Sequence, residues 1–232
     1  MEVQLEFSTP FQSGQNYTLT VENISDEQGN IVPTQSTVFS FFRIEKAQPY
    51  DLLITEIMAD PTPTIGLPDA EWIEIYNRSD KTIALEEVVF EDGSSERILS
   101  GTLAPGEYAI VCDDGDAADL EVFGKLIELS SFPALTNGGE LLTLKNTDNQ
   151  IIHAVDFSDS WYRDPGKKEG GWTLELINIL TPCIGAENWM ASVNLNGGTP
   201  GRQNSVFQDI PDETFLDLLT VFPESELSLI HI

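Results

Sequence analysis

The sequence predicts an all-β protein built as a sandwich of short strands. Many short stretches alternate between apolar and polar side chains, which is the period of a half-buried strand. Gly, Pro, Asn and Asp separate these stretches at close intervals, as turns between strands do. Helical periodicity is absent between residues 50 and 206. Short strands with frequent turns are typical of a β-sandwich.

The segment 51–77 organises the rest of the prediction. Residues 52–57 and 71–76 each alternate, which predicts two strands. We expect a rigid surface loop between them, because neither a helix nor a central strand accepts so many breakers. The breakers are Pro61, Pro63, Gly66 and Pro68. Two acidic pairs lie near this loop, and we expect them to keep an edge strand soluble: Glu56 with Asp60, and Glu71 with Glu74.

Further strands are expected on both sides of this segment, from the same alternation and from the turns between them. Before it, they lie at residues 2–7, 17–21 and 38–44, with a turn at 25–30. After it, they lie near residues 83–90, 108–112, 126–129, 140–144, 151–157 and 170–177.

Three motifs resemble one known family. EIMADP at 56–61, followed by a loop and EWIEIYN at 71–77, is similar to the start of the lamin-tail domain found in secreted and surface proteins of bacteria. LAPGEYAIVCD at 103–113 resembles its central turn and strand, while TPCIGAENWMAS and NGGTPGRQNSV resemble its end. The resemblance covers about residues 50–206 and implies an immunoglobulin-like β-sandwich of the lamin-tail type.

The flanks resemble truncated immunoglobulin-like segments. Residues 1–46 are similar to the C-terminal half of such a repeat, and 207–232 are expected to hold a linker and the first strand or strands of another. An amphipathic helix from Asp212 to Leu219 is the competing interpretation of the tail. Because each half-domain would present an unpaired edge, we expect strand-swapped self-association or poorly ordered ends.

The charge balance restricts the partners. The chain has 11 basic and 39 acidic residues, hence a net charge of −28, which opposes binding to nucleic acid. No apolar run reaches the ~20 residues of a membrane span, and no signal peptide opens the sequence. We expect an extracellular or cell-surface protein whose signal peptide lies outside this fragment, with protein or carbohydrate partners at the cell surface.

Catalytic constellations are not evident in the sequence. Cys112 and Cys183 have no metal or redox spacing, which excludes a zinc site and leaves either one disulfide or two buried free thiols. His153 lies in an alternating strand and His231 near the end of the sequence, so no nucleophile has a base beside it. We expect no enzyme, and a core or surface role for His153.

Two candidate sites follow from local composition. Asp113, Asp114, Asp116 and Asp119 crowd one loop and could share a calcium ion, although the spacing is not that of an EF-hand and a solvated loop is the alternative. Trp161, Tyr162 and Arg163 precede a cationic loop and form the candidate ligand site. Trp72 and Trp189 are expected in the core.

We therefore expect a non-catalytic β-sandwich module of a multidomain secreted or cell-surface protein, acting as a spacer, adhesion or ligand-binding unit. The alternative is an accessory module of an extracellular hydrolase, stabilised by calcium.

Overall fold

The two strands predicted on either side of the Pro-rich loop form the centre of the fold. β4 (Leu52–Met58) and β5 (Trp72–Asn77) pair antiparallel, and every residue of β4 is buried. The computed structural model describes residues 5–25, 29–31, 33–93 and 95–209. The strand or helix expected in the tail beyond residue 209 lies outside the described residues.

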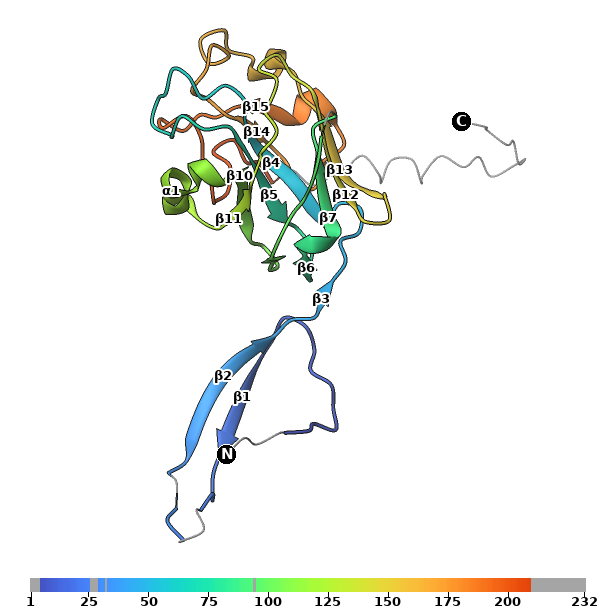
Figure 1. The fold of residues 1–232 in the computed structure, drawn as a ribbon, viewed down its shortest axis with the longest axis vertical. Coiled ribbons are helices and arrows are strands. Elements are labelled where there is room, and N and C mark those ends of the chain that lie inside the picture. Colours follow the sequence, from blue (N-terminus) through green and yellow to red (C-terminus); the bar gives the residue numbers. More distant parts are fainter. Residues whose placement is uncertain (1–4, 26–28, 32, 94, 210–232) are drawn as a thin grey trace, which may run out of the picture.

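A six-stranded sheet extends on both sides of this pair. Its order is β11-β10-β5-β4-β14-β15, and only β10 and β11 run parallel. The added strands are β10 (Tyr108–Asp113), β11 (Leu126–Leu129), β14 (Leu174–Leu176) and β15 (Trp189–Ala191). Strands far apart in the sequence thus pair with the central segment (Figure 1).

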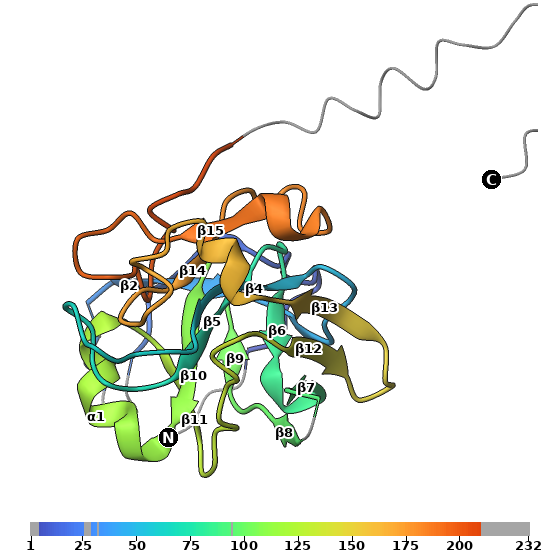
Figure 2. The ribbon, with the colours of Figure 1, turned by 90° about the horizontal axis from the view of Figure 1, so that it is seen from above.

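A second, antiparallel sheet packs on the first. Its order is β13-β12-β7-β8, and Figure 2 shows the two sheets as two layers. Its strands are β7 (Val88–Glu91), β8 (Glu96–Ile98), β12 (Leu141–Asn146) and β13 (Ile151–Asp156). Ile54, Ile73, Phe90, Leu144 and Trp189 belong to the apolar core between the layers. The all-β sandwich predicted from the sequence is confirmed.

Short elements complete the domain. β3 (Ile44–Glu45), β6 (Thr82–Ala84) and β9 (Thr102–Leu103) form a three-stranded sheet. The one α-helix of the described residues, α1 (Ala117–Leu120), has four residues, too few to show as a period in the sequence. The 3-10 turns are η1 (Leu85–Glu87), η2 (Asp114–Asp116), η3 (Glu121–Phe123), η4 (Asp159–Tyr162) and η5 (Gly185–Asn188).

The outer face of the six-stranded sheet is also buried. Met58, Trp72, Ile110 and Cys112 form a second apolar cluster there, with Leu120 of α1 and with Leu67 and Ala70 of the Pro-rich loop. The loop predicted as a surface excursion therefore contributes residues that cover the sheet. This explains why no residue of β4 reaches solvent, although the strand includes Thr55 and Glu56.

The N-terminal residues form a hairpin that projects from the sandwich (Figure 1). β1 (Gln15–Val21) pairs antiparallel with β2 (Gln35–Phe41) in a two-stranded sheet. The strand predicted at residues 2–7 is wrong in its described part: residues 5–7 pair with no strand, and Phe7 packs its ring on Phe11 instead, at 4.9 Å. The strand predicted at 38–44 ends earlier, at Phe41, and β3 follows.

Candidate functional site

Three glutamates lie side by side on the outer face of the six-stranded sheet. Glu56 pairs across strands with Glu74 on one side and with Glu175 on the other, and all three are fully buried. The alternation that places Ile73 and Leu174 in the core places these carboxyl groups on the opposite face. Among the described residues, no lysine or arginine forms a salt bridge with any of the three.

The closing loop at residues 197–206 supplies most of their hydrogen-bond donors. Glu56 Oε1 also accepts from the Thr173 hydroxyl at 2.6 Å, and Glu74 Oε1 from the Thr55 hydroxyl at 2.7 Å. From the loop, Thr199 N donates to Glu56 and Gly201 N donates to Glu74, both at 2.7 Å. Glu175 accepts three hydrogen bonds from the loop: from Thr199 Oγ1 (2.9 Å), Ser205 Oγ (2.7 Å) and Val206 N (3.1 Å). The carboxyl groups thus hold the loop against the sheet.

The burial of these groups favours a bound proton. Desolvation, followed by the carboxylates of Glu74 and Glu175, raises the pKa of Glu56 well above its ordinary value. Desolvation also raises the pKa of Glu74 to about 8, although hydrogen bonds from Thr55 and Gly201 oppose the rise. Glu56 Oε2 is buried without a hydrogen-bond partner. Burial therefore favours the protonated forms of Glu56 and Glu74 in the folded protein.

The role expected for the acidic pairs near the Pro-rich loop is wrong for Glu56 and Glu74. Both lie on the two central strands of the sheet rather than at an edge. They are buried rather than exposed because loops cover the outer face of the sheet. Glu71 instead accepts a hydrogen bond from Leu135 N at 2.7 Å. The sequence did not identify Glu175 at all, and the signal that could have found it is its position between Leu174 and Leu176 in a short apolar strand.

The candidate ligand residues at 161–163 contact the protein's own groups. Trp161 packs against the core, Tyr162 is buried and Arg163 is exposed. The ring of Trp161 packs on the ring of Trp189, with 6.2 Å between centroids. The Tyr162 hydroxyl donates to the carbonyl of Trp172 at 3.1 Å, and the Arg163 guanidinium donates to the carbonyl of Ala186 at 2.7 Å. The structure therefore gives these side chains structural contacts, and a ligand here stays a prediction.

The acidic loop after β10 is more ordered than predicted. Asp113 accepts hydrogen bonds from Gly115 N and Phe132 N, both at 3.0 Å, and these lower its pKa. Asp114 and Asp116 lie in η2, and Asp119 lies in α1. In the described part of the chain, no group of three or more His, Cys, Asp or Glu side chains is placed to hold a metal ion. Calcium binding therefore rests on the sequence alone and stays a prediction.

The cysteines and His153 lie in different environments. Both cysteines are free; Cys112 is buried, as expected of a thiol, but Cys183 is exposed, which was not expected. Cys183 Sγ donates to the hydroxyl of Tyr50 at 3.0 Å, beside a cavity of about 420 Å³ that His153 also lines. His153 Nδ1 accepts from Ile54 N at 3.0 Å, and burial lowers the His153 pKa to about 4, so of the core and surface roles expected for it the structure shows the core role.

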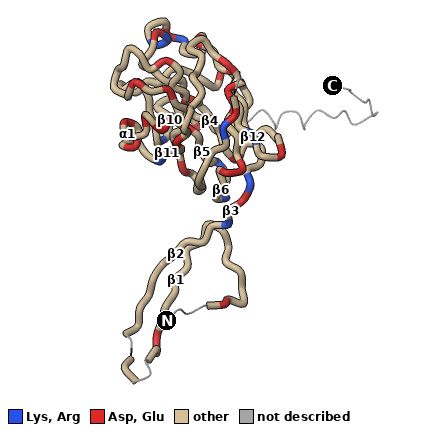
Figure 3. The backbone as a smooth tube through the Cα atoms, viewed as in Figure 1, with Lys and Arg blue, Asp and Glu red and all other residues tan. Residues whose placement is uncertain are grey.

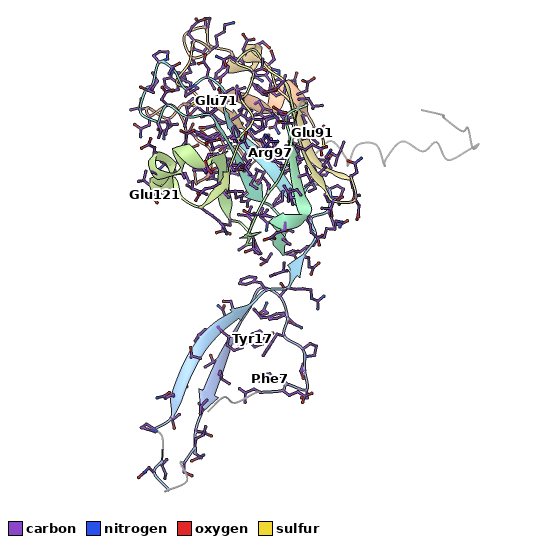
Figure 4. The ribbon with its side chains drawn as sticks, viewed as in Figure 1. Phe7, Tyr17, Glu71, Glu91, Arg97 and Glu121 are labelled. Atoms are coloured by element: carbon purple, nitrogen blue, oxygen red, sulfur yellow. The ribbon has the colours of Figure 1, made fainter. Side chains whose placement is uncertain are left out.

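The hairpin carries an aromatic groove that the sequence prediction missed. Phe11 contacts the rings of Tyr17, Phe39 and Phe41, with centroids 4.6, 5.4 and 5.6 Å apart. A groove of about 390 Å³ lies between these strands and the segment 7–12, and Figure 4 shows Phe7 and Tyr17 on its two sides. Tyr17 and Leu19 in β1, like Phe39 and Phe41 in β2, are two residues apart. This two-residue spacing of apolar side chains in both strands could have indicated an apolar face of the hairpin.

The fold defines the chain as an immunoglobulin-like β-sandwich module. Residues 45–159 match the family model of the Lamin Tail Domain, and this part of the chain is a lamin tail domain. The match ends before the closing motif, although β14, β15 and the loop at 197–206 complete the same sandwich. A bacterial subgroup, the domain boundaries and the flanking repeats stay predictions.

Other comparisons add no relative. No curated protein and no solved structure matches the chain. Within the residues that the structure describes, no helix is both long and apolar enough to cross a membrane.

Proposed function

We propose that this chain is a non-catalytic module of a multidomain secreted or cell-surface protein, where it serves as a spacer, adhesion or ligand-binding unit. One contrast supports the proposal: the sandwich buries its cluster of three glutamates and His153, whereas the hairpin exposes an apolar groove. Glu56, Glu74, Glu175 and His153 are inaccessible and hydrogen-bonded to the protein itself. Phe7, by comparison, is 51% exposed.

The acidity of the sandwich supports an extracellular setting. The chain's net charge of −28 favours solubility and opposes nonspecific adhesion to anionic polymers. In Figure 3, Asp and Glu positions are distributed along the backbone of the sandwich, whereas β1 and β2 contain no charged residue. A binding surface on this molecule is therefore best sought on the hairpin.

A binding panel tests the proposal. The full chain is immobilised and its binding to neutral polysaccharides and extracellular matrix proteins is measured, while the same samples are assayed for hydrolysis products. We expect saturable binding of one ligand without turnover. Leu19→Asp, on the apolar face of the hairpin, should abolish this binding, whereas Val38→Asp, on the opposite face, should preserve it.

Two results would count against the proposal. Turnover of a substrate by the purified chain would make it an enzyme. Equal binding by both hairpin variants would place the ligand elsewhere, with residues 161–163 as the next surface to test.

A further inference from the structure

The hairpin has one polar and one apolar face. Cross-strand pairs alternate between the faces, so Tyr17 opposite Phe39 and Leu19 opposite Thr37 share the apolar side. On the other side, Ser40 donates to Asn16 at 2.6 Å, and the hydroxyls of Thr20 and Ser36 lie 2.9 Å apart. The polar face is therefore adapted to water, and the apolar face is adapted to a partner.

Both edges of the hairpin are open as well. In the described residues, β1 and β2 pair only with each other, so each strand has one row of backbone groups without a strand beside it. A two-stranded sheet is at best marginally stable in water, because it buries too little apolar surface. The segment 7–12 covers part of the apolar face but leaves the groove between itself and the strands. The groove therefore fits an extended apolar segment.

One segment of the chain has the required sequence. Residues 216–222, LDLLTVF, lie outside the described residues and contain a single charged residue, Asp217. The segment has seven residues, the length of both β1 and β2, and Pro223 follows it. Leu216, Leu218 and Phe222 fall on one side of a two-residue period, which is the pattern of a strand with an apolar face.

We propose that residues 216–222 of a second copy of this chain occupy the aromatic groove of the hairpin and add a strand to it. Each copy has one groove and one such segment, so the exchange is reciprocal and closes as a symmetric dimer. The inference rests on the proposed use of the groove as a binding surface and names its occupant. Since it is tested with the purified chain alone, its failure leaves the proposed binding of an external ligand to be decided by the panel.

Electrostatics gives the association a distinct salt dependence. Two copies with a net charge of −28 each repel one another at long range, while the contacting faces carry few charges. Salt screens the repulsion and leaves the apolar contact intact. Dimerisation should therefore strengthen with added sodium chloride, which is the opposite of what an ion-paired interface would show.

The test is a complementation experiment by light scattering after size exclusion, over a concentration series at low and high salt. Leu218→Asp disables the segment, Leu19→Asp disables the groove, and Val38→Asp is the matched control on the polar face. We expect the unaltered chain and the control to form dimers, and each disabled variant alone to have a dissociation constant raised about tenfold or more. An equimolar mixture of the two disabled variants should dimerise again, because one intact groove meets one intact segment.

The mixture protects the test from misfolding. Leu19→Asp contributes only its segment to the mixed dimer, so a disordered hairpin in that variant does not matter. A monomeric unaltered chain at every concentration would overturn the proposal, as would a monomeric mixture. A dimer that persists in Leu218→Asp would also overturn it, because the occupant would then be another surface, such as a second hairpin.

Discussion

Replacing Glu56 with Gln should weaken the dependence of the sandwich's stability on pH. The amide oxygen of Gln can accept both hydrogen bonds that Glu56 Oε1 accepts, from the Thr173 hydroxyl and from Thr199 N. The atom that changes, Oε2, has no hydrogen-bond partner. The substitution therefore removes an ionisable group beside two other buried carboxyl groups while it keeps the closing loop in place.

The sign of the effect follows from the raised pKa values. An unfolded glutamate releases its proton near pH 4.5, whereas Glu74 in the folded protein holds it up to about pH 8 and Glu56 also titrates well above 4.5. The stability from the bound proton is fully present below the unfolded pKa and is lost as the pH rises through the folded values. Each proton taken up on folding lowers the free energy of unfolding by about 1.4 kcal/mol per pH unit in this window.

The magnitude is large enough to measure. Over the window set by Glu74 the loss reaches several kcal/mol at most, a sizeable part of a domain stability of roughly 5–15 kcal/mol. Because Glu56 and Glu74 are cross-strand neighbours, their titrations are coupled, and replacing Glu56 also relieves the repulsion that acts on Glu74.

Urea unfolding of the full chain, followed by tryptophan fluorescence between about pH 5 and about pH 8, measures the effect. Glu121→Gln is the control, because Glu121 is an exposed glutamate on η3 (Figure 4) and its replacement also removes one carboxyl group. We expect the unaltered chain and the control to lose stability in parallel. Glu56→Gln should lose less, by up to about 1.4 kcal/mol per pH unit. A slope for Glu56→Gln parallel to that of the control would refute the reasoning.

Three further predictions test other parts of the structure. Cys183 is exposed, whereas Cys112 is buried with its pKa raised to about 12, so a thiol reagent should label one cysteine in the native chain and two after denaturation; two native labels would contradict this arrangement. Gly106 and Gly201 both have positive φ, +73° and +77°, but only at Gly201 would a Cβ meet a backbone oxygen, that of Phe123. Gly106→Ala should therefore cost about 1–2 kcal/mol and Gly201→Ala clearly more, and equal losses in urea unfolding would show that the close approach is absent. If the loop at 113–119 binds calcium, calcium should raise the melting temperature more than magnesium does and Asp116→Asn should remove the difference; calorimetry without heat at about millimolar calcium would end that hypothesis.

The strands could be predicted where local alternation and β-forming residues coincide. β4, β5 and β13 lie within two residues of the predicted bounds, and Trp72 and Trp189 are buried as expected. These features depend on neighbours along the chain, which alternation reports directly. The short α1 escaped because four residues cannot show a helical period.

The buried carboxyl groups could not be predicted in the same way. Alternation assigns a polar residue of a strand to solvent, and it does so correctly unless another segment covers that face. For Glu56 the covering residue is Thr199, 143 positions further along the chain. No local pattern contains such a contact, so Glu56 and Glu74 were assigned to an edge. The aromatic groove depends in the same way on Phe7 and Phe11, which lie outside any strand.

The closing loop explains why a sandwich would keep three acidic groups inside. Residues 197–206 contain Gly, Pro and Asn and form no strand, so their buried backbone N–H groups have no ladder to donate to. An unpaired buried N–H is costly, and a carboxyl oxygen accepts such donors strongly. Thr199, Gly201 and Val206 each donate to a different one of the three glutamates. The glutamates thus replace the missing strand partner, and the loop requires all three of them. Since an edge strand would have supplied those bonds without buried charge, the pH dependence of Glu56 is a direct consequence of closing this sandwich with an irregular loop.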